Sequence, residues 1–182
     1  MIAYALPWVT SPEDRVLLRA AYDAYTTAVR DALSELARDG ALLLLHSYAP
    51  RTVDVEVDLE IVTSLRAAYR PEVEPTWPLR PELDVIGTAL DGTSHAPTRV
   101  VAELRRELAA TGLSVANSST YPLHPSTLAW DHVMAYPGRA FCLEGRRDLL
   151  ADPFEPFAEM RIAPTTVERI AGPLAAALRI WW

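Results

Sequence analysis

The chain has 182 residues with 17 basic and 24 acidic side chains, so its formal net charge is −7. This acidic balance argues against a nucleic-acid surface, and no apolar run reaches the roughly 18 residues of a membrane-spanning helix. The single cysteine, Cys142, excludes an internal disulfide, and the first residues lack the basic region of a secretory leader. We therefore expect one cytoplasmic domain over residues 1–182, with Cys142 as a small core residue.

The basic residues are unusual because all 17 are arginine and the sequence contains no lysine. Chemistry that needs a Schiff-base lysine or a phosphate-loop lysine is therefore excluded. Any cation that anchors a substrate carboxylate must be an arginine, which can grip a carboxylate through two hydrogen bonds.

The first half of the chain predicts two helices around a strand. Ser11 followed by Pro12 and two acids is a strong helix start, and apolar residues then recur at helical spacing over 12–38. The continuous apolar run 41–45 predicts a strand buried on both faces, as in a parallel sheet. Residues 51–58 alternate acids with valines, which indicates an edge strand. Asp58 then starts a helix over 59–69, and four prolines exclude regular structure up to about residue 82.

The second half predicts strands over 83–86, 113–116 and 139–144, and helices over 97–110 and 164–180. Residues 117–138 are predicted as a long polar loop, a feature that is more often functional than idle. Trp181 and Trp182 are expected to dock on the body or on a partner. The alternation of helices and strands indicates an α/β fold, a three-layer sandwich with a mostly parallel central sheet flanked by helices.

Two of the predicted strands end in groups that can bind a metal or move a proton. His46 follows the run 41–45, and Glu144 ends the strand 139–144. Ligands of α/β folds bind at the carboxyl ends of strands, so the two residues look like halves of one site. His46 fits a zinc ligand and a polar strand terminator equally well. A partly buried Glu144 suits a general base, and the alternative is a salt bridge to Arg146 or Arg147.

The loop after residue 116 adds further candidates for binding a substrate: Asn117, Tyr121, His124 and Thr127. Tyr121 or an arginine could polarise a carbonyl or hold an oxyanion. His124 is an isolated loop histidine, and such a residue rarely ligates a metal without partners.

Three motifs, in this order, resemble the N-formylglutamate amidohydrolase family over roughly residues 12–180. The first is the His-Ser-aromatic strand end in 45–50. The second is the Asn/Tyr loop of 117–127, and the third is a glutamate strand followed by Arg-Arg-Asp-Leu in 143–150. The resemblance implies an α/β fold related to zinc carboxypeptidases, with a zinc held by two histidines and one acid.

By this resemblance the protein is a hydrolase that cleaves the C–N amide bond of an N-acyl amino acid or a similar small carboxylate. His46 would be the second histidine ligand of zinc, and Glu144 would be the catalytic base that takes a proton from zinc-bound water. Arg51, Arg146 or Arg147 would hold the substrate carboxylate, with Arg146 favoured.

The sequence departs from the family at its metal site, because the family's first histidine and acidic ligand lie upstream and no histidine precedes His46. Catalytic zinc needs about three protein ligands, and only His46 is defensible from the residues alone. One reading is that a segment carrying the first strand is missing, which leaves an unpaired sheet edge that risks dimerisation or aggregation and would allow a homodimer. A second is a non-catalytic relative that acts as a binding or interaction module. A third is a rebuilt site, in which His124 or His132 joins Asp131 or Asp54.

Overall fold

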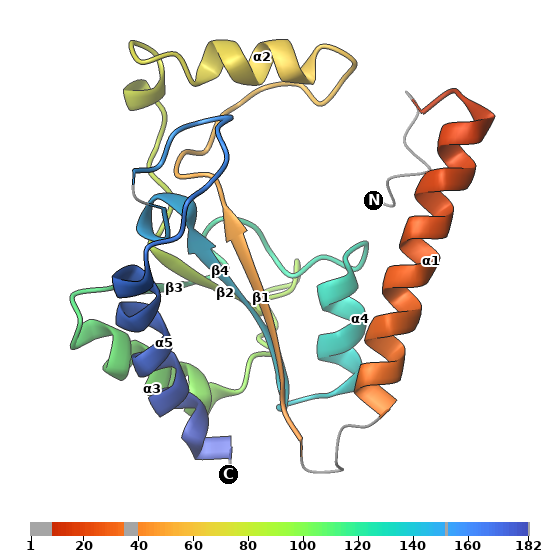
Figure 1. Cartoon of the computed structure of the whole chain (residues 1–182). Coiled ribbons are helices and arrows are strands. Elements are labelled where there is room, and N and C mark those ends of the chain that lie inside the picture. Colours follow the sequence, from red (N-terminus) through yellow and green to blue (C-terminus); the bar gives the residue numbers. More distant parts are fainter. Residues whose placement is uncertain (1–8, 35–39, 152, 182) are drawn as a thin grey trace.

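A computed structural model describes residues 9–34, 40–151 and 153–181 (Figure 1). Helices alternate with strands along most of the chain. In chain order the elements are α1 (Pro12–Ser34), β1 (Leu42–Tyr48), α2 (Ile61–Ala68), the 3-10 turn η2 (Glu74–Thr76), β2 (Leu83–Ile86), α3 (Thr98–Ala109), β3 (Val115–Asn117), α4 (Leu128–Ala135), β4 (Ala140–Arg146), η3 (Arg147–Leu149), α5 (Pro164–Leu178) and η4 (Arg179–Trp181).

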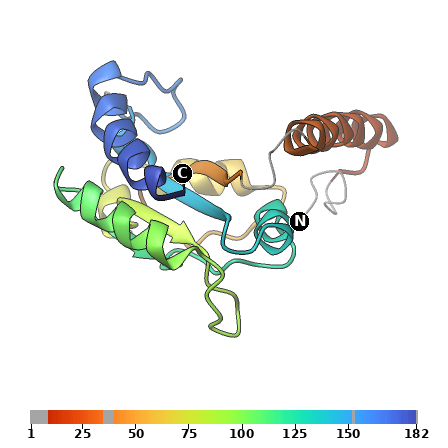
Figure 2. The ribbon, with the colours of Figure 1, turned by 90° about the horizontal axis from the view of Figure 1, so that it is seen from below.

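The four strands form one sheet in the order β1-β4-β2-β3. The outer pairs, β1 with β4 and β2 with β3, are parallel, whereas the central pair, β4 with β2, is antiparallel. Helices α3 and α5 cover one face of the sheet, and α4 covers part of the other, with α1 beyond it (Figures 1 and 2). This arrangement confirms the predicted α/β sandwich with a mostly parallel sheet.

The face toward α3 and α5 holds the larger hydrophobic core. Strand alternation turns Leu83 and Val85 of β2, with Phe141 and Leu143 of β4, toward this side. Every one of these four side chains is at most 2 % exposed. The Trp181 ring packs 5.5 Å from that of Phe141, which agrees with the predicted docking of the C-terminal tryptophans. Trp182 lies outside the described residues.

The opposite face carries a smaller core around Ile86, Leu123, Val133, Ala140 and Cys142. The loop prediction for 117–138 is wrong over α4, which packs on β4 through this cluster. Thr127 caps the helix, since its Oγ1 accepts a hydrogen bond from the Trp130 backbone N–H at 3.3 Å. A helix of eight residues between prolines is too short to show a clear apolar period, so the burial of Val133 decides its structure.

Strand β1 was predicted to be buried on both faces, and this is wrong. β1 lies at the edge of the sheet and pairs only with β4 among the described strands. The Leu45 side chain is 60 % exposed, because no described segment covers it. The continuous apolar run therefore identified a strand but not its position in the sheet.

The edge strand predicted for 51–58 is also wrong. Only an isolated bridge between Arg51 and Leu79 forms there. The facing segments exchange two backbone hydrogen bonds, from the Thr52 N–H to the Pro78 oxygen and from the Arg80 N–H to the Pro50 oxygen, each 2.9 Å. A longer ladder cannot follow, because proline has no N–H to donate.

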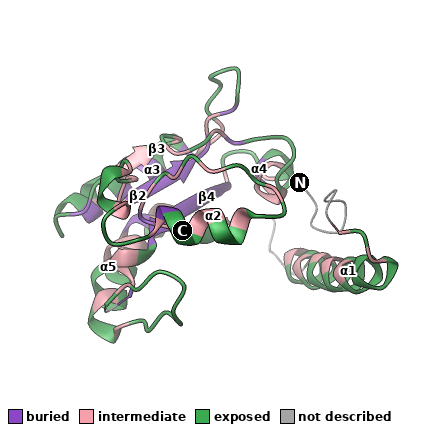
Figure 3. Cartoon of the chain, turned by 90° about the horizontal axis from the view of Figure 1, so that it is seen from above, coloured by how far each residue is buried: buried purple, intermediate pink, exposed green. Residues whose placement is uncertain are grey.

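Helix α1 begins as predicted, with the Ser11 hydroxyl accepting a hydrogen bond from the Asp14 N–H at 3.2 Å. Residues 35–38 of the predicted helix lie outside the described residues. None of the 23 residues of α1 is buried, and α1 stands apart from the purple core elements in Figure 3. In the described part of the chain, no helix is long and apolar enough to cross a membrane.

Candidate functional site

His46 and Glu144 lie side by side on neighbouring strands. The parallel register of β1 and β4 pairs His46 with Glu144, and the antiparallel register of β4 and β2 pairs Glu144 with Asp84. Paired residues project on the same face of a sheet, so the three side chains form one row on the α4 side. Exposure falls along this row, since His46 is exposed, Glu144 is 5 % exposed and Asp84 is fully buried.

In the part of the chain that the structure describes, the polar side-chain partner of the Glu144 carboxylate is Tyr121, whose hydroxyl donates a short hydrogen bond to Oε1. Burial raises the pKa of the Tyr121 phenol far above its ordinary value, and the hydrogen bond to Glu144 raises it further. The phenol therefore keeps its proton across the physiological range and remains a donor. Tyr121 as a residue is 40 % exposed, so the pair can be reached from solvent.

Two residues that the sequence analysis did not single out hold the loop that carries Tyr121. The buried Asp84 carboxylate accepts the Ser119 N–H at 3.2 Å and the Thr120 N–H at 2.7 Å. Ser118 adopts a left-handed φ of 47°, and its hydroxyl accepts the N–H groups of Gly87 and Thr88 at 3.0 and 2.9 Å. An acid inside the apolar run 83–86 was the signal that could have identified Asp84.

Glu144 faces a cavity of about 790 Å³, which we call the glutamate cavity. The strand residues His46, Cys142 and Glu144 line one side, and Tyr121 and Thr127 lie among the residues of the other. Tyr22 and Tyr25 of α1 also contribute to the lining. Burial raises the pKa of the Cys142 thiol to about 12, so this cysteine is an unreactive core residue at neutral pH.

Two predicted loop residues lie outside the lining of the glutamate cavity. Asn117 is exposed at the end of β3. His124 is exposed too, and its Nδ1 lies 2.7 Å from the Ser126 hydroxyl and accepts the Ser126 N–H at 3.1 Å. The imidazole thus stabilises the turn that leads into α4.

None of the three predicted arginine anchors lines the glutamate cavity. Arg146 is 9 % exposed and its guanidinium is committed, since its Nε bonds Asp148 Oδ1 at 2.8 Å and its Nη1 bonds the Arg80 oxygen at 3.0 Å. Arg51 and Arg147 instead line a second cavity. Among the described residues, the candidate base and the candidate carboxylate anchors are therefore separated.

The zinc site implied by the sequence resemblance does not form from the residues that the structure describes. His132 and Asp131 line the same cavity as His46 and Glu144. Even so, no three His, Cys, Asp or Glu side chains of the described chain come close enough together to hold a metal ion. The alternative set of His124 or His132 with Asp131 or Asp54 is likewise not assembled. His46 remains a single candidate ligand, fewer than the three that catalytic zinc requires.

Comparison with known proteins supports the fold. No family model matches the sequence, and no curated protein matches it. Among solved structures, the chain is similar to an N-formylglutamate amidohydrolase from Ralstonia eutropha JMP134, with a TM-score of 0.50 and 18 % sequence identity. The match covers 95 % of this chain and 55 % of that one, so the chain spans about half the length of the enzyme. Its fold resembles that of an amidohydrolase.

Proposed function

We propose that the protein is a hydrolase that cleaves the C–N amide bond of an N-acyl amino acid or a similar small carboxylate. The observation that carries this proposal is the placement of Glu144. Its carboxylate is nearly buried, bonded by Tyr121, in register with His46, and open to a cavity large enough for a metabolite. The amidohydrolase-like fold adds support from outside the site.

In the proposed reaction, Glu144 acts as a general base. A carboxylate oxygen of Glu144 takes a proton from water as the water oxygen attacks the amide carbonyl carbon. The Tyr121 hydroxyl turns from Glu144 toward the developing oxyanion and stabilises it as a protonated donor. The proton then passes from Glu144 to the leaving nitrogen as the C–N bond breaks, which yields a carboxylic acid and an amine.

Zinc enters this proposal only through His46, which would supply one ligand. A catalytic ion needs further protein ligands that the described residues do not bring together. We therefore assign no step of the reaction to a metal.

The test is the Glu144→Gln variant assayed with N-formyl-L-glutamate, with and without added zinc, by release of the free amine. Loss of the base should lower turnover by about 10²-fold or more, while circular dichroism stays unchanged. Glu168→Gln is the matched control, because Glu168 is an exposed glutamate on α5. Equal turnover in Glu144→Gln and the parent would exclude Glu144 as the base.

A second candidate is a non-catalytic relative that binds a small carboxylate or amide. Two observations favour it. The Tyr121 hydroxyl is already hydrogen-bonded to an oxygen of Glu144, and the described residues hold no group of three metal ligands. Calorimetric titration with N-formyl-L-glutamate separates the two candidates. Saturable binding with no amine released over many hours would support the binding module over the enzyme.

A further inference from the structure

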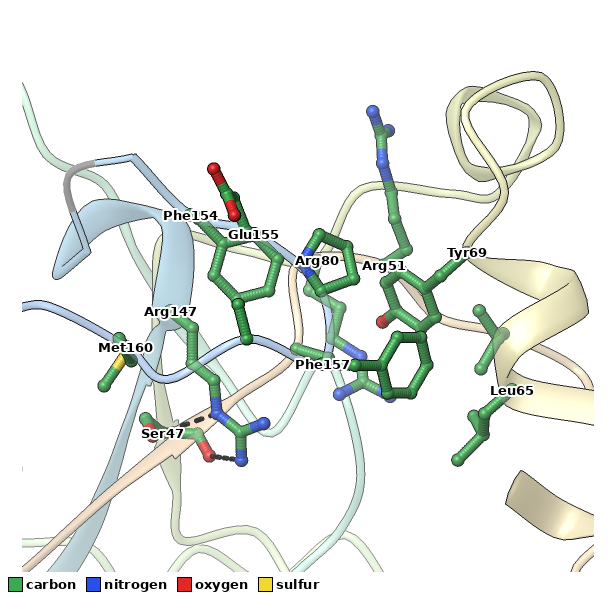
Figure 4. A pocket seen from close by; sticks show the side chains of 14 residues that line it. Ser47, Arg51, Leu65, Tyr69, Arg80, Arg147, Phe154, Glu155, Phe157 and Met160 are labelled. Atoms are coloured by element: carbon green, nitrogen blue, oxygen red, sulfur yellow. Dashed lines mark hydrogen bonds between the residues drawn. The ribbon is translucent and has the colours of Figure 1, made fainter. Parts of the chain in front are cut away.

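A second cavity of about 690 Å³ opens on the other side of the end of β1 (Figure 4). Successive residues of a strand point to opposite faces, so Ser47 lines this cavity while His46 lines the glutamate cavity. We call it the arginine cavity. Its lining includes three arginines, Arg51, Arg80 and Arg147, and the aromatic residues Tyr69 and Phe157.

Two of its arginines offer free cationic donors. The Arg80 Nε donates to the Thr52 hydroxyl at 3.2 Å, and Arg147 makes long hydrogen bonds of 3.3 and 3.4 Å to Ser47. These bonds use only part of the five N–H donors on each guanidinium. Neither arginine has an ion-pair partner among the described residues.

The third arginine differs, because the Arg51 Nε is paired with Glu74 Oε1 at 2.6 Å. In Figure 4 the Arg147 side chain extends toward Ser47, whereas that of Arg51 extends away from it. Glu155 lines the cavity as an exposed acid. The positive charge available to a ligand therefore comes from Arg80 and Arg147.

An unpaired hydroxyl lies beside these cations. The Tyr69 hydroxyl is buried and has no hydrogen-bond partner among the described residues. Burial raises the pKa of this phenol, and the nearby positive charge of Arg80 acts against the rise. A buried donor without an acceptor is costly, so an anion that accepts from Tyr69 would remove that cost.

The apolar part of the arginine cavity includes a residue with an unusual backbone conformation. Phe157 has a φ of 64°, in the left-handed region that bulky side chains rarely adopt. Its ring packs edge-on against Tyr69 at 5.8 Å and beneath the Arg66 guanidinium at 5.3 Å, yet it remains 56 % exposed. Backbone strain of this kind concentrates at ligand clamps and active sites.

We propose that the arginine cavity binds a small organic anion, a carboxylate attached to an aromatic group. The ligand's carboxylate is held by Arg80 and Arg147 and accepts a hydrogen bond from the Tyr69 hydroxyl. The ligand's aromatic group stacks near Phe157. The volume lies within the range of small-molecule sites. This inference stands whether or not Glu144 is a catalytic base, because it uses the opposite side of β1.

The test is calorimetric titration of the whole chain with phenylacetate. We expect saturable binding that weakens about tenfold or more in Arg80→Gln and in Arg147→Gln, the loss expected for a charge-assisted hydrogen bond. Tyr69→Phe should also weaken binding. The neutral analogue phenylacetamide and the small ion acetate should each bind much more weakly, since each lacks one of the two recognised groups.

Controls separate this site from the rest of the molecule. Arg99→Gln removes an arginine that does not line the arginine cavity and should leave the affinity unchanged. Glu144→Gln should also bind phenylacetate with the affinity of the parent. A change in either direction, most of all tighter binding of the anion once the Glu144 charge is removed, would locate the ligand in the glutamate cavity and overturn the proposal. Absence of saturable binding would overturn it as well, and so would parent-like affinity in Arg147→Gln, which changes an exposed side chain.

Discussion

Helices α3 and α1 share a helical spacing of apolar residues but not an environment. α3 is 12 residues long and buries four apolar side chains, Val100, Val101, Leu104 and Leu108. α1 is almost twice as long, with 23 residues, and buries none. The comparison teaches that an amphipathic pattern specifies a helix and its apolar face, whereas the presence of a partner for that face is a tertiary property.

The same contrast separates the two strands that carry the candidate site. All seven residues of β4 are buried, whereas β1 leaves Leu45 and His46 exposed at the edge of the sheet. Glu144 thus comes from a fully buried strand, and His46 comes from an exposed position on the edge strand. The candidate site forms where the packed and open parts of the molecule meet.

The largest effect is expected from Leu104→Ala in α3. Leu104 is fully buried in the main core, and its truncation should lower the free energy of unfolding by about 2–5 kcal/mol. Urea unfolding followed by circular dichroism measures this change. A loss below about 1 kcal/mol would show that the α3 face is packed less tightly than the structure describes.

The second largest effect is expected from Asp84→Asn in β2. This variant tests whether hydrogen bonds stabilise the α4 side of the sheet, where packing is sparse. Asp84→Asn replaces one carboxylate oxygen by an NH₂ group facing the N–H of Ser119 or Thr120. We expect a loss of about 1–3 kcal/mol in unfolding free energy, because a buried donor then lacks an acceptor. An unfolding midpoint equal to that of the parent would contradict this role for Asp84.

A smaller and pH-dependent effect is expected at the start of β2. Hydrogen bonds from the Ser114 N–H and hydroxyl to Glu82 Oε2, each 2.8 Å, hold the pKa of Glu82 below its ordinary value. Its stabilisation is therefore full above the unfolded-state pKa of about 4.3. It is lost as the pH falls through the lower folded value.

Unfolding midpoints of the parent and Glu82→Gln, measured between neutral pH and acid, test this linkage. The parent should be more stable at neutral pH, and the difference should shrink as the pH falls below about 4. A difference that does not change with pH would mean that the Glu82 charge contributes nothing.

The smallest effect is expected from Leu17→Ala in α1, which makes the same change as Leu104→Ala in an exposed place. The Leu17 side chain is 69 % exposed, so its truncation should change the unfolding free energy by less than about 0.5 kcal/mol. A loss approaching that of Leu104→Ala, most of all one that depends on protein concentration, would show that α1 is covered in solution and would break the comparison.

Much of the candidate site could be predicted, because it depends on the ends of two strands. The runs before His46 and Glu144 identified both strands, and ends of parallel strands were expected to meet at one edge of the sheet. The register that pairs His46 with Glu144 is known only from the structure. The separation of the arginines from Glu144 could not be predicted. The separation has two causes. Arg51 and Arg147 lie on the side of the β1 end that faces the arginine cavity. The Arg146 guanidinium is bonded to Asp148 and to the Arg80 backbone.

The sequence by itself determined the local structure: the α1 start at Ser11, the strands 83–86 and 139–144, the α/β alternation, and an arginine as the only strong cation. Those features depend on neighbouring residues, whose caps, periods and turns act over a few positions. The tertiary structure alone decided that β1 is an edge strand, that α4 forms, that Tyr121 bonds Glu144, and that two cavities flank one strand end. These depend on contacts between residues far apart in the chain, where burial outweighs local preference.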